Sequence, residues 1–426
     1  MPKPKILLKK VAAKLGLIAA QTEARAVDEA LAYIADYWET LKREHIEDSG
    51  TIIGLPNPYI VPASDKKARF TFEEQYYWDS YFIALGLVNT KHQKIAEGML
   101  ENLLHIYKRF HFIPNASRMY LMSRSQPPIL TSFIRLIYET GKKDHQWLKD
   151  HMAVAEDEYR KVWMNDTHPL WHRVHKGLSR YYNINVLHDL AEAESGWDMT
   201  PRFERKCLDY LPIDLNSLLY KYEMDFAWGA QIYGTAKQVH AWQNSARKRK
   251  NEVDKLMWHK RKGMYFDYNY AKSQLGDVWS LAGYFPLWSG MASAEQAERL
   301  VRNIAKFEQT GGLTTTTRPL IDTSIFGSLK TQWAYPNGWS PLHWVVIEGL
   351  ENYGYHDEAQ RIAHKWIHTN LDWYERHGEF IEKYNVVNPR KHPVEGVYPS
   401  QSGFGWTNAV FTRLVEKYPL DQVSEQ

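Results

Sequence analysis

The sequence predicts an all-α protein in which helical hairpins form a toroid, with an inner ring of six helices inside an outer ring of six. Three observations favour this fold. Apolar residues three and four positions apart recur along most of the chain, whereas strand-like alternation is short and rare. The loops between these stretches carry Gly, Pro and Trp, which suits a site built from loops at one end of a ring. No composition shift or low-complexity linker divides the chain, although a two-domain helical array is the alternative.

The helices are expected in a regular order along the chain. The first covers residues 23–41, where Ala26, Ala30 and Ile34 share one face. The same spacing predicts further helices over residues 78–88, 92–110, 129–140, 144–163, 186–194, 213–233, 236–258, 278–285, 293–307, 341–352, 356–375 and 406–416. The best strand signal covers residues 264–269 and would form a minor hairpin.

We expect residues 21–420 to form a single domain, preceded by an N-terminal arm or short helix over residues 1–20. In that arm Lys9, Lys10 and Lys14 interrupt the apolar run that a secretory signal needs. No stretch of about 20 apolar residues exists, so no membrane span is expected. The single cysteine excludes an intrachain disulfide and fits a reducing compartment. We therefore expect a cytoplasmic protein, and we expect it to be a monomer.

Charge and motif content exclude several classes of function. A net charge of +3 is too small to indicate nucleic-acid binding. The chain has no zinc-helix, paired-cysteine or calcium-loop motif, and His343, His364 and His368 are expected to be structural. It also has no nucleophile elbow, phosphate loop or dinucleotide fingerprint. We therefore expect no metal and no cofactor.

Aromatic residues are unusually placed. The chain has 17 Trp and 27 Tyr, many of them beside Gly, Pro or Asn rather than inside apolar runs. Such residues belong either to an aromatic-rich core or to a sugar site, where ring faces pack against pyranoses. Composition leaves both interpretations open.

Two acidic residues stand in unusual surroundings. Asp198 ends the run Glu194-Ser-Gly-Trp-Asp198, and Glu382 is followed by a lysine and a tyrosine. Cleavage of a glycosidic bond needs two carboxyl groups, one protonated and one ionised. Shielding by the neighbouring Trp would raise the pKa of Asp198, while a helix N-cap is the alternative role. The lysine would keep Glu382 ionised, although an exposed Glu-Lys pair is commonplace.

Polar and aromatic loops offer a binding surface. The run Arg124-Ser-Gln-Pro-Pro128 presents a guanidinium, a hydroxyl and an amide on a loop stiffened by two prolines. The run Tyr76-Tyr-Trp-Asp79 adds stacking faces and an acceptor. Each run has a structural alternative, as a loop before a helix and as the start of a core helix.

Eight motifs together resemble the trehalases, the α,α-trehalose glycosidase family. They occur in the family's order between about residue 75 and residue 410. The motifs are Gln75-Tyr-Tyr-Trp-Asp-Ser-Tyr-Phe82, Ile113-Pro-Asn115, Arg124-Ser-Gln-Pro-Pro128, Glu194-Ser-Gly-Trp-Asp198, Pro212-Ile-Asp-Leu-Asn216, Gln332-Trp-Ala-Tyr-Pro-Asn-Gly-Trp339, Glu382-Lys-Tyr384 and Gly403-Phe-Gly-Trp-Thr-Asn408.

The resemblance implies an (α/α)6 toroid and hydrolysis of trehalose to two glucose molecules with inversion. It implies that Asp198 is the general acid and Glu382 the general base, which requires roughly 6.5–9.5 Å between the carboxyls. A small sugar is the only partner it implies. Sugar-binding roles fall on Arg69, Phe72, Trp78, Asp79, Asn115, Arg124, Ser125, Gln126, Gly196, Trp333, Trp339 and Glu395.

Some segments depart from the family pattern. Arg69 lies two places further from Trp78 than the family's arginine, and Ala334 stands where an aspartate is expected. The family's Arg-Pro-Glu-Ser segment is missing, and Arg173 or Arg180 would have to replace its arginine. Residues 388–393 replace a glycine-rich lid. These parts hold the second sugar in the family, so another α-glycoside, such as glucosylglycerate or mannosylglycerate, is the alternative substrate.

Overall fold

The computed structural model describes residues 4–64, 72–165, 168, 170–318, 331–396 and 399–420, with the backbone alone for residues 4–22. Its α-helices are α1 (Pro4–Leu41), α2 (Tyr77–Leu85), α3 (Gln93–Phe110), α4 (Leu130–Tyr138), α5 (His145–Glu158), α6 (His188–Glu194), α7 (Ile213–Tyr233), α8 (Ala236–Leu256), α9 (Phe285–Trp288), α10 (Ala294–Asn303), α11 (Ser340–Asn352), α12 (His356–His377) and α13 (Gly405–Lys417).

The strands are two or three residues long and pair antiparallel. They are β1 (Lys42–Arg43), β2 (Tyr59–Ile60), β3 (Arg173–His175), β4 (Leu178–Ser179), β5 (Tyr210–Leu211), β6 (Trp258–His259), β7 (Met264–Tyr265), β8 (Tyr268–Asn269), β9 (Gln274–Leu275), β10 (Glu308–Gln309), β11 (Gly312–Leu313), β12 (Asn337–Trp339) and β13 (Lys383–Asn385). They form the pairs β1–β2, β3–β4, β6–β7, β10–β11 and β12–β13 and the triplet β5–β8–β9.

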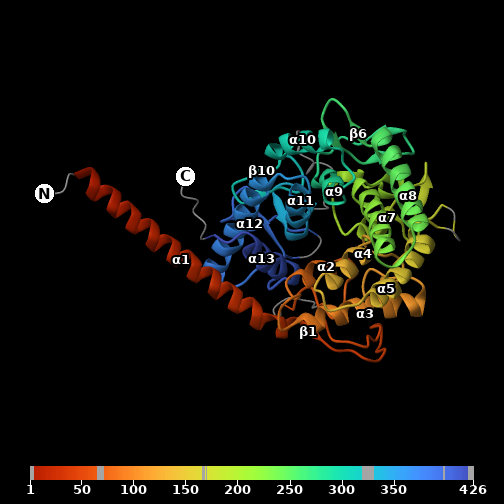
Figure 1. Cartoon of the computed structure of the whole chain (residues 1–426), viewed down its shortest axis with the longest axis horizontal. Helices are drawn as coiled ribbons and strands as arrows, with labels where there is room; N and C mark the ends of the chain where they lie inside the picture. Colours follow the sequence, from red (N-terminus) through yellow and green to blue (C-terminus); the bar gives the residue numbers. More distant parts are fainter. Residues whose placement is uncertain are drawn as a thin grey trace.

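Within the described residues, six helices form a closed inner ring. Each of α2, α4, α7, α9, α11 and α13 packs against the next, and α13 returns to α2. The remaining long helices lie outside: α3 against α2 and α4, α5 against α4 and α7, α8 against α7, and α12 against α11 and α13 (Figure 1). The expected (α/α)6 toroid is confirmed.

Sequence decides which helix lies inside. All nine residues of α2 are buried, and seven of them are apolar or aromatic, which suits a helix enclosed by others. By contrast, α8 buries only Ala246, Arg249 and Val253 along its 21 residues. A helix with one narrow apolar face can cover the ring but cannot be part of its centre.

The first helix is longer than expected. It runs without a break from Pro4 to Leu41 and so crosses the predicted boundary at residue 20. Its buried residues Ala30, Ile34 and Trp38 belong to the core, and it packs on α12 and α13 as an outer helix. Figure 1 shows its N-terminal part extending away from the rest of the molecule.

Two other expectations need correction. The helix expected over 278–285 is a 3₁₀ turn, Leu281–Tyr284, followed by the short α9, because Pro286 has no N–H and fits only the first turn of a helix. The strand signal over 264–269, expected to form one minor hairpin, is divided between β7, which pairs antiparallel with β6, and β8, which pairs with β5 and β9.

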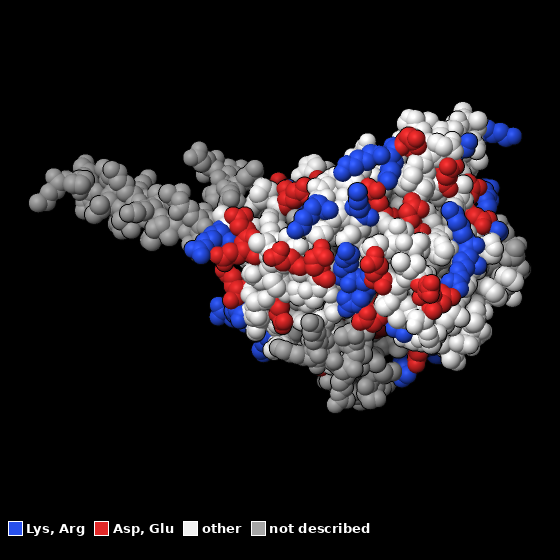
Figure 2. All heavy atoms as spheres, turned by 90° about the horizontal axis from the view of Figure 1, so that it is seen from below, with Lys and Arg blue, Asp and Glu red and all other residues white. Residues whose placement is uncertain are grey.

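The surface mixes charges of both signs. On the face seen in Figure 2, the blue and red residues are interspersed. Several charged residues are partners one helical turn apart, such as Glu156 with Arg160 and Asp157 with Lys161. Among the described residues, no helix is long and apolar enough to cross a membrane.

The contact that closes the ring gives a stability prediction. Gly86 follows α2, and a Cβ atom there would lie 2.6 Å from Cα and 2.9 Å from Cβ of Ala409 on α13. The substitution Gly86→Ala should therefore push α2 and α13 apart and lower the free energy of unfolding by about 1–3 kcal/mol. Urea unfolding measures this loss.

The exposed neighbour Lys91 supplies the control, because Lys91→Ala should change stability by no more than about 0.5 kcal/mol. An unchanged midpoint for Gly86→Ala would contradict the close approach of the two helices.

Candidate active site

The loop that carries Asp198 follows α6 and is fixed on both sides. Gly196 has a φ of +73°, and a Cβ atom there would lie 2.8 Å from Cε2 of Trp78, so glycine permits the contact with α2. Trp197 is fully buried, with the guanidinium of Arg202 4.5 Å from its ring centroid. Arg202 in turn pairs with Asp214 at 2.7 Å and Asp267 at 2.8 Å.

Asp198 is not a helix cap. The 3₁₀ turn Pro201–Phe203 is capped by Thr200, whose side chain accepts a hydrogen bond from the N–H of Arg202. The alternative role of Asp198 as a helix N-cap is therefore wrong, and its carboxyl is not used for capping.

Glu194 connects the loop of Arg124, Ser125 and Gln126 to the loop of Asp198. Its buried carboxylate accepts hydrogen bonds from N–H of Ser125 at 2.8 Å and N–H of Tyr182 at 2.6 Å, and it pairs with His172 at 3.1 Å. Gln126 then accepts from the N–H of Trp78 at 2.9 Å. The motifs around residues 78, 125 and 194 are thus one hydrogen-bonded unit.

Asn115 and Ser125 support this unit through their side chains. The amide of Asn115 donates to the carbonyl of Ser125 at 3.1 Å, and the hydroxyl of Ser125 donates to the carbonyl of Ile113 at 2.7 Å. Both side chains are buried, so they hold the loop in its conformation.

Glu382 enters from the opposite half of the chain. It directly precedes β13, which pairs with β12 so that Trp339 faces Lys383 in register. The Glu382 side chain is buried, and Lys383, also buried, places Nζ 2.5 Å from Oε2. The indole of Trp406 donates to the carbonyl of Glu382 at 3.2 Å. The weighed alternative of an exposed Glu-Lys pair is therefore wrong.

Three carboxyl groups, those of Asp79, Asp198 and Glu382, interact electrostatically. The pKa of Asp198 is raised to about 7, chiefly by burial and also by the charge of Glu382, while its own main-chain N–H, Arg124 and Lys383 act against this. The pKa of Asp79, on α2, is raised to about 8, chiefly by burial and also by the charges of Glu382 and Asp198, while its own main-chain N–H and Gln126 act against this. These three side chains therefore lie close enough for the charge of one to shift the pKa of another.

Aromatic rings form one wall of this cluster. Trp333 stacks on Trp339 at 3.7 Å and 2°, and Trp78 lies 6.0 Å from Trp333 and 6.1 Å from Trp406. Trp339 is fully buried, so it supports the ring of Trp333. Phe72 lies 5.5 Å from Tyr76, beside the start of α2.

Other residues predicted for the site have different surroundings or lie outside the described residues. Glu395 is exposed, although its neighbour Val394 is tied to Asn337 of β12 by two hydrogen bonds. Arg69 lies outside the described residues. Arg180 donates to three main-chain carbonyls and to the hydroxyl of Tyr270, so its guanidinium is used within the fold. Arg173 is exposed on β3.

Sequence reasoning missed two buried residues of the site. Glu192, on α6, accepts a hydrogen bond from the N–H of Thr200 at 2.7 Å, and burial, with the charge of Asp198, raises its pKa to about 8. Gln332 donates from Nε2 to the main-chain carbonyl of Asp198 at 2.6 Å. Gln332 opens one of the recognised motifs, but nothing in the sequence indicates its partner.

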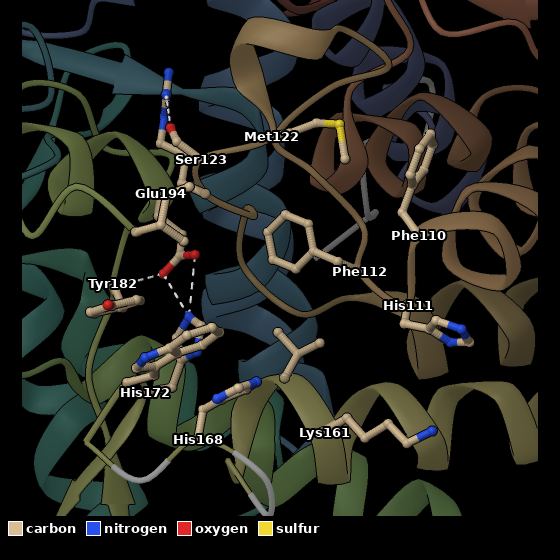
Figure 3. Close-up of a pocket in the computed structure, with 14 residues that line it drawn as sticks. Phe110, His111, Phe112, Met122, Ser123, Lys161, His168, His172, Tyr182 and Glu194 are labelled. Atoms are coloured by element: carbon tan, nitrogen blue, oxygen red, sulfur yellow. Dashed lines mark hydrogen bonds and ion pairs between the residues drawn. The ribbon is translucent and has the colours of Figure 1, made fainter.

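A cavity of about 370 Å³ lies beside the cluster. Arg124 and Glu194 belong to its lining, whereas Asp198 and Glu382 do not. Figure 3 shows Phe112, Lys161, His172 and Tyr182 around it, with Glu194 bonded to His172. This cavity therefore touches the loop of Arg124 and the carboxylate of Glu194 but not the two candidate catalytic carboxyls.

The described part of the chain contains no group of three or more His, Cys, Asp or Glu residues that could hold a metal ion. His343 is structural, as expected, because Nε2 accepts from the N–H of Leu313 and Nδ1 bonds the carbonyl of Trp339.

Comparisons with known proteins identify the family and the fold. A family model described as Trehalase matches residues 8–196 and 171–419. The structure of neutral trehalase Nth1 from Saccharomyces cerevisiae aligns with a TM-score of 0.74 and 29% identity, over 84% of this chain and 73% of that one. A GH63 mannosylglycerate hydrolase from Thermus thermophilus, in complex with glucose, aligns with a TM-score of 0.63 and 19% identity, over 83% and 95% of the two chains. The match to the mannosylglycerate hydrolase shows a similarity of fold alone.

Removing the charge of Glu382 should change the titration of Asp198. In Glu382→Gln the pKa of Asp198 should fall below about 7, because the carboxylate that repels its negative charge is gone. The carboxyl stretching band that disappears in Asp198→Asn identifies this group in infrared titrations. Glu375→Gln, an exposed change on α12, should leave the titration in place. An unshifted band in Glu382→Gln would contradict the coupling.

Asp79 should make stability depend on pH. Its folded pKa of about 8 lies above the ordinary value of 3.8, so folding takes up a proton between these values and stability falls as pH rises through them. Asp79→Asn keeps the shape without the charge. Urea unfolding between about pH 5 and pH 8 should therefore show a flatter pH dependence for the variant, which should be the more stable form near pH 8. Equal slopes for both proteins would refute this account.

Proposed function

This chain belongs to the trehalase family and is a glycoside hydrolase, and on that premise we propose that it hydrolyses α,α-trehalose to two glucose molecules with inversion at one anomeric carbon. The observation that carries the proposal is the pair of carboxyls, Asp198 and Glu382, in opposite electrostatic surroundings. An inverting hydrolase needs one carboxyl as acid and one as base.

Asp198 is the proposed general acid. Its pKa of about 7 keeps a large share of the group protonated at neutral pH, so a proton is available for the bridging oxygen. The bond between that oxygen and the anomeric carbon breaks as the proton arrives. Activity should accordingly decline as pH rises through about 7, because the acid form is lost.

Glu382 is the proposed general base. Lys383 provides a cationic partner for a carboxylate that is removed from water, which stabilises its charged form. Glu382 takes a proton from a water molecule on the face of the sugar opposite Asp198, and the oxygen of that water bonds the anomeric carbon. Exchange of both protons with solvent restores the starting state.

The neighbouring residues are proposed to hold the cleaved sugar. Asp79 is largely protonated at neutral pH, so it can donate a hydrogen bond to a hydroxyl as well as accept one. Arg124 and Gln126 add donors beside it, and Trp78 and Trp333 supply an apolar wall for the ring.

A second candidate is an inverting hydrolase of another α-glycoside, such as glucosylglycerate or mannosylglycerate. Three observations favour it: Ala334 has no carboxylate, Glu395 is exposed to solvent, and Arg180 is committed to main-chain carbonyls. Ala334 and Arg180 concern places where the family pattern supports the second sugar, and Glu395 falls near another acidic residue of that pattern.

Incubation with trehalose, followed by proton NMR, tests the reaction. Equal amounts of α- and β-glucose should appear at first, since one half of a symmetric substrate inverts and the other keeps its configuration. Formation of α-glucose alone would refute inversion. Turnover of another α-glycoside, without turnover of trehalose, would favour the second candidate.

Variants test the two roles. Asp198→Asn and Glu382→Gln should each lower kcat for the substrate by about 10²–10⁴-fold, because each removes one proton transfer. The exposed Glu375→Gln should keep wild-type kcat. Near-normal activity in either site variant would overturn that residue's role.

A further inference from the structure

We propose that Gln332 is a positioning residue that sets the distance between the general acid and the general base. The inference rests on the proposed function, because it concerns the same two carboxyls. It follows from a chain of contacts that leads from Asp198 to Glu382 through one short segment, and Gln332 is the only side chain of that segment that bonds the main chain of Asp198 within the described residues.

The segment holds the acid at two consecutive positions. Nε2 of Gln332 donates to the carbonyl of Asp198 at 2.6 Å, and the N–H of Trp333 donates to the carbonyl of Met199 at 3.1 Å. Gln332 itself is fully buried. Two bonds to adjacent carbonyls fix both the place and the direction of the backbone from which the Asp198 side chain projects.

The same residue is tied to the strand pair that carries the base. Its carbonyl accepts from the amide of Asn337 at 2.9 Å and from the indole of Trp339 at 3.3 Å. Both donors belong to β12, and Trp339 pairs with Lys383 in β13. Lys383 lies 5.0 Å over the ring of Trp339 and holds the carboxylate of Glu382.

Gln332 has little freedom to move. A Cβ atom on Gly396 would lie 2.6 Å from its side-chain Cδ, so main chain covers it from one side. In the described part of the chain, its Oε1 is buried without a hydrogen-bond partner. A buried acceptor without a partner costs free energy. The hydrogen bond from Nε2 to the carbonyl of Asp198 is therefore the favourable polar contact of this side-chain amide.

The inference predicts a loss that depends on the leaving group. If Gln332 aligns the acid, Gln332→Met should lower kcat for trehalose by about 10- to 100-fold, because proton transfer requires correct alignment. Hydrolysis of α-glucosyl fluoride should change by less than about threefold, since fluoride leaves with little protonation. A residue that only supports the fold would lower both rates equally.

Gln332→Leu is the second variant, in case the methionine variant does not fold. Its side chain is apolar and has no N–H that could donate to the carbonyl of Asp198. The same selective loss on the poor leaving group is expected. Gln296→Met is the matched control, because Gln296 is a buried glutamine in the cap of α10, and it should keep the wild-type ratio of the two rates.

A double variant separates alignment from stability. Because Gln332 acts through Asp198, Gln332→Met should add less than about a threefold loss of trehalose kcat to Asp198→Asn. Multiplying losses, or an unchanged ratio of trehalose to fluoride rates in the single variants, would overturn the inference. Failure of the proposed function would look different, because the wild type itself would not cleave trehalose; the ratio test would then be run with the α-glycoside it does cleave.

Discussion

Ionisable groups removed from water at the centre of the ring are the constraint on which the rest of the structure depends. A carboxyl in such a place must be protonated, paired or bonded by donors, because isolated charge is costly there. The site uses all three solutions. Asp79 and Asp198 have raised pKa values, Glu382 has the cation of Lys383, and Glu194 collects two main-chain N–H groups and a histidine.

These solutions recruit distant parts of the chain. The donors of Glu194 come from the loops at residues 125 and 182, and the lysine comes from a strand that exists only by pairing with β12. Further out, the buried guanidinium of Arg202 joins Asp214 and Asp267 while supporting Trp197. The chemistry and the stability of this protein therefore share the same residues, and a substitution at the site alters both.

Much of the fold follows from the sequence because long amphipathic helices leave a periodic record. The elements that sequence reasoning misplaced have a local cause: Pro286 breaks one expected helix, and the lysine-rich start of α1 conceals its continuity to Pro4. Strands of two or three residues have no period to detect. The pairing of β12 with β13, which places Glu382, could therefore not be predicted from periodicity.

The residues of the site were likewise predictable only in part. Motif resemblance selected Asp198 and Glu382, which lie 184 positions apart (382 − 198), and the structure brings them into one electrostatic cluster. It did not indicate what Gln332 or Glu192 does, because their partners are identified only by contacts between side chain and main chain across folded loops. The sequence left open whether Arg173 or Arg180 replaces the missing arginine, and the structure uses the guanidinium of Arg180 for main-chain carbonyls.

The closure of the ring has a consequence for how the chain is made. Its inner circle joins α2, near the start of the chain, to α13, near its end, and α13 also brings the indole of Trp406 to the carbonyl of Glu382. During synthesis α2, whose residues are all buried in the folded ring, emerges long before its partner α13, which begins 320 positions after α2 ends (405 − 85). Contacts so distant in sequence form late, and uncovered apolar surface favours association in the meantime. The inner ring can therefore close only after the last helix has left the ribosome.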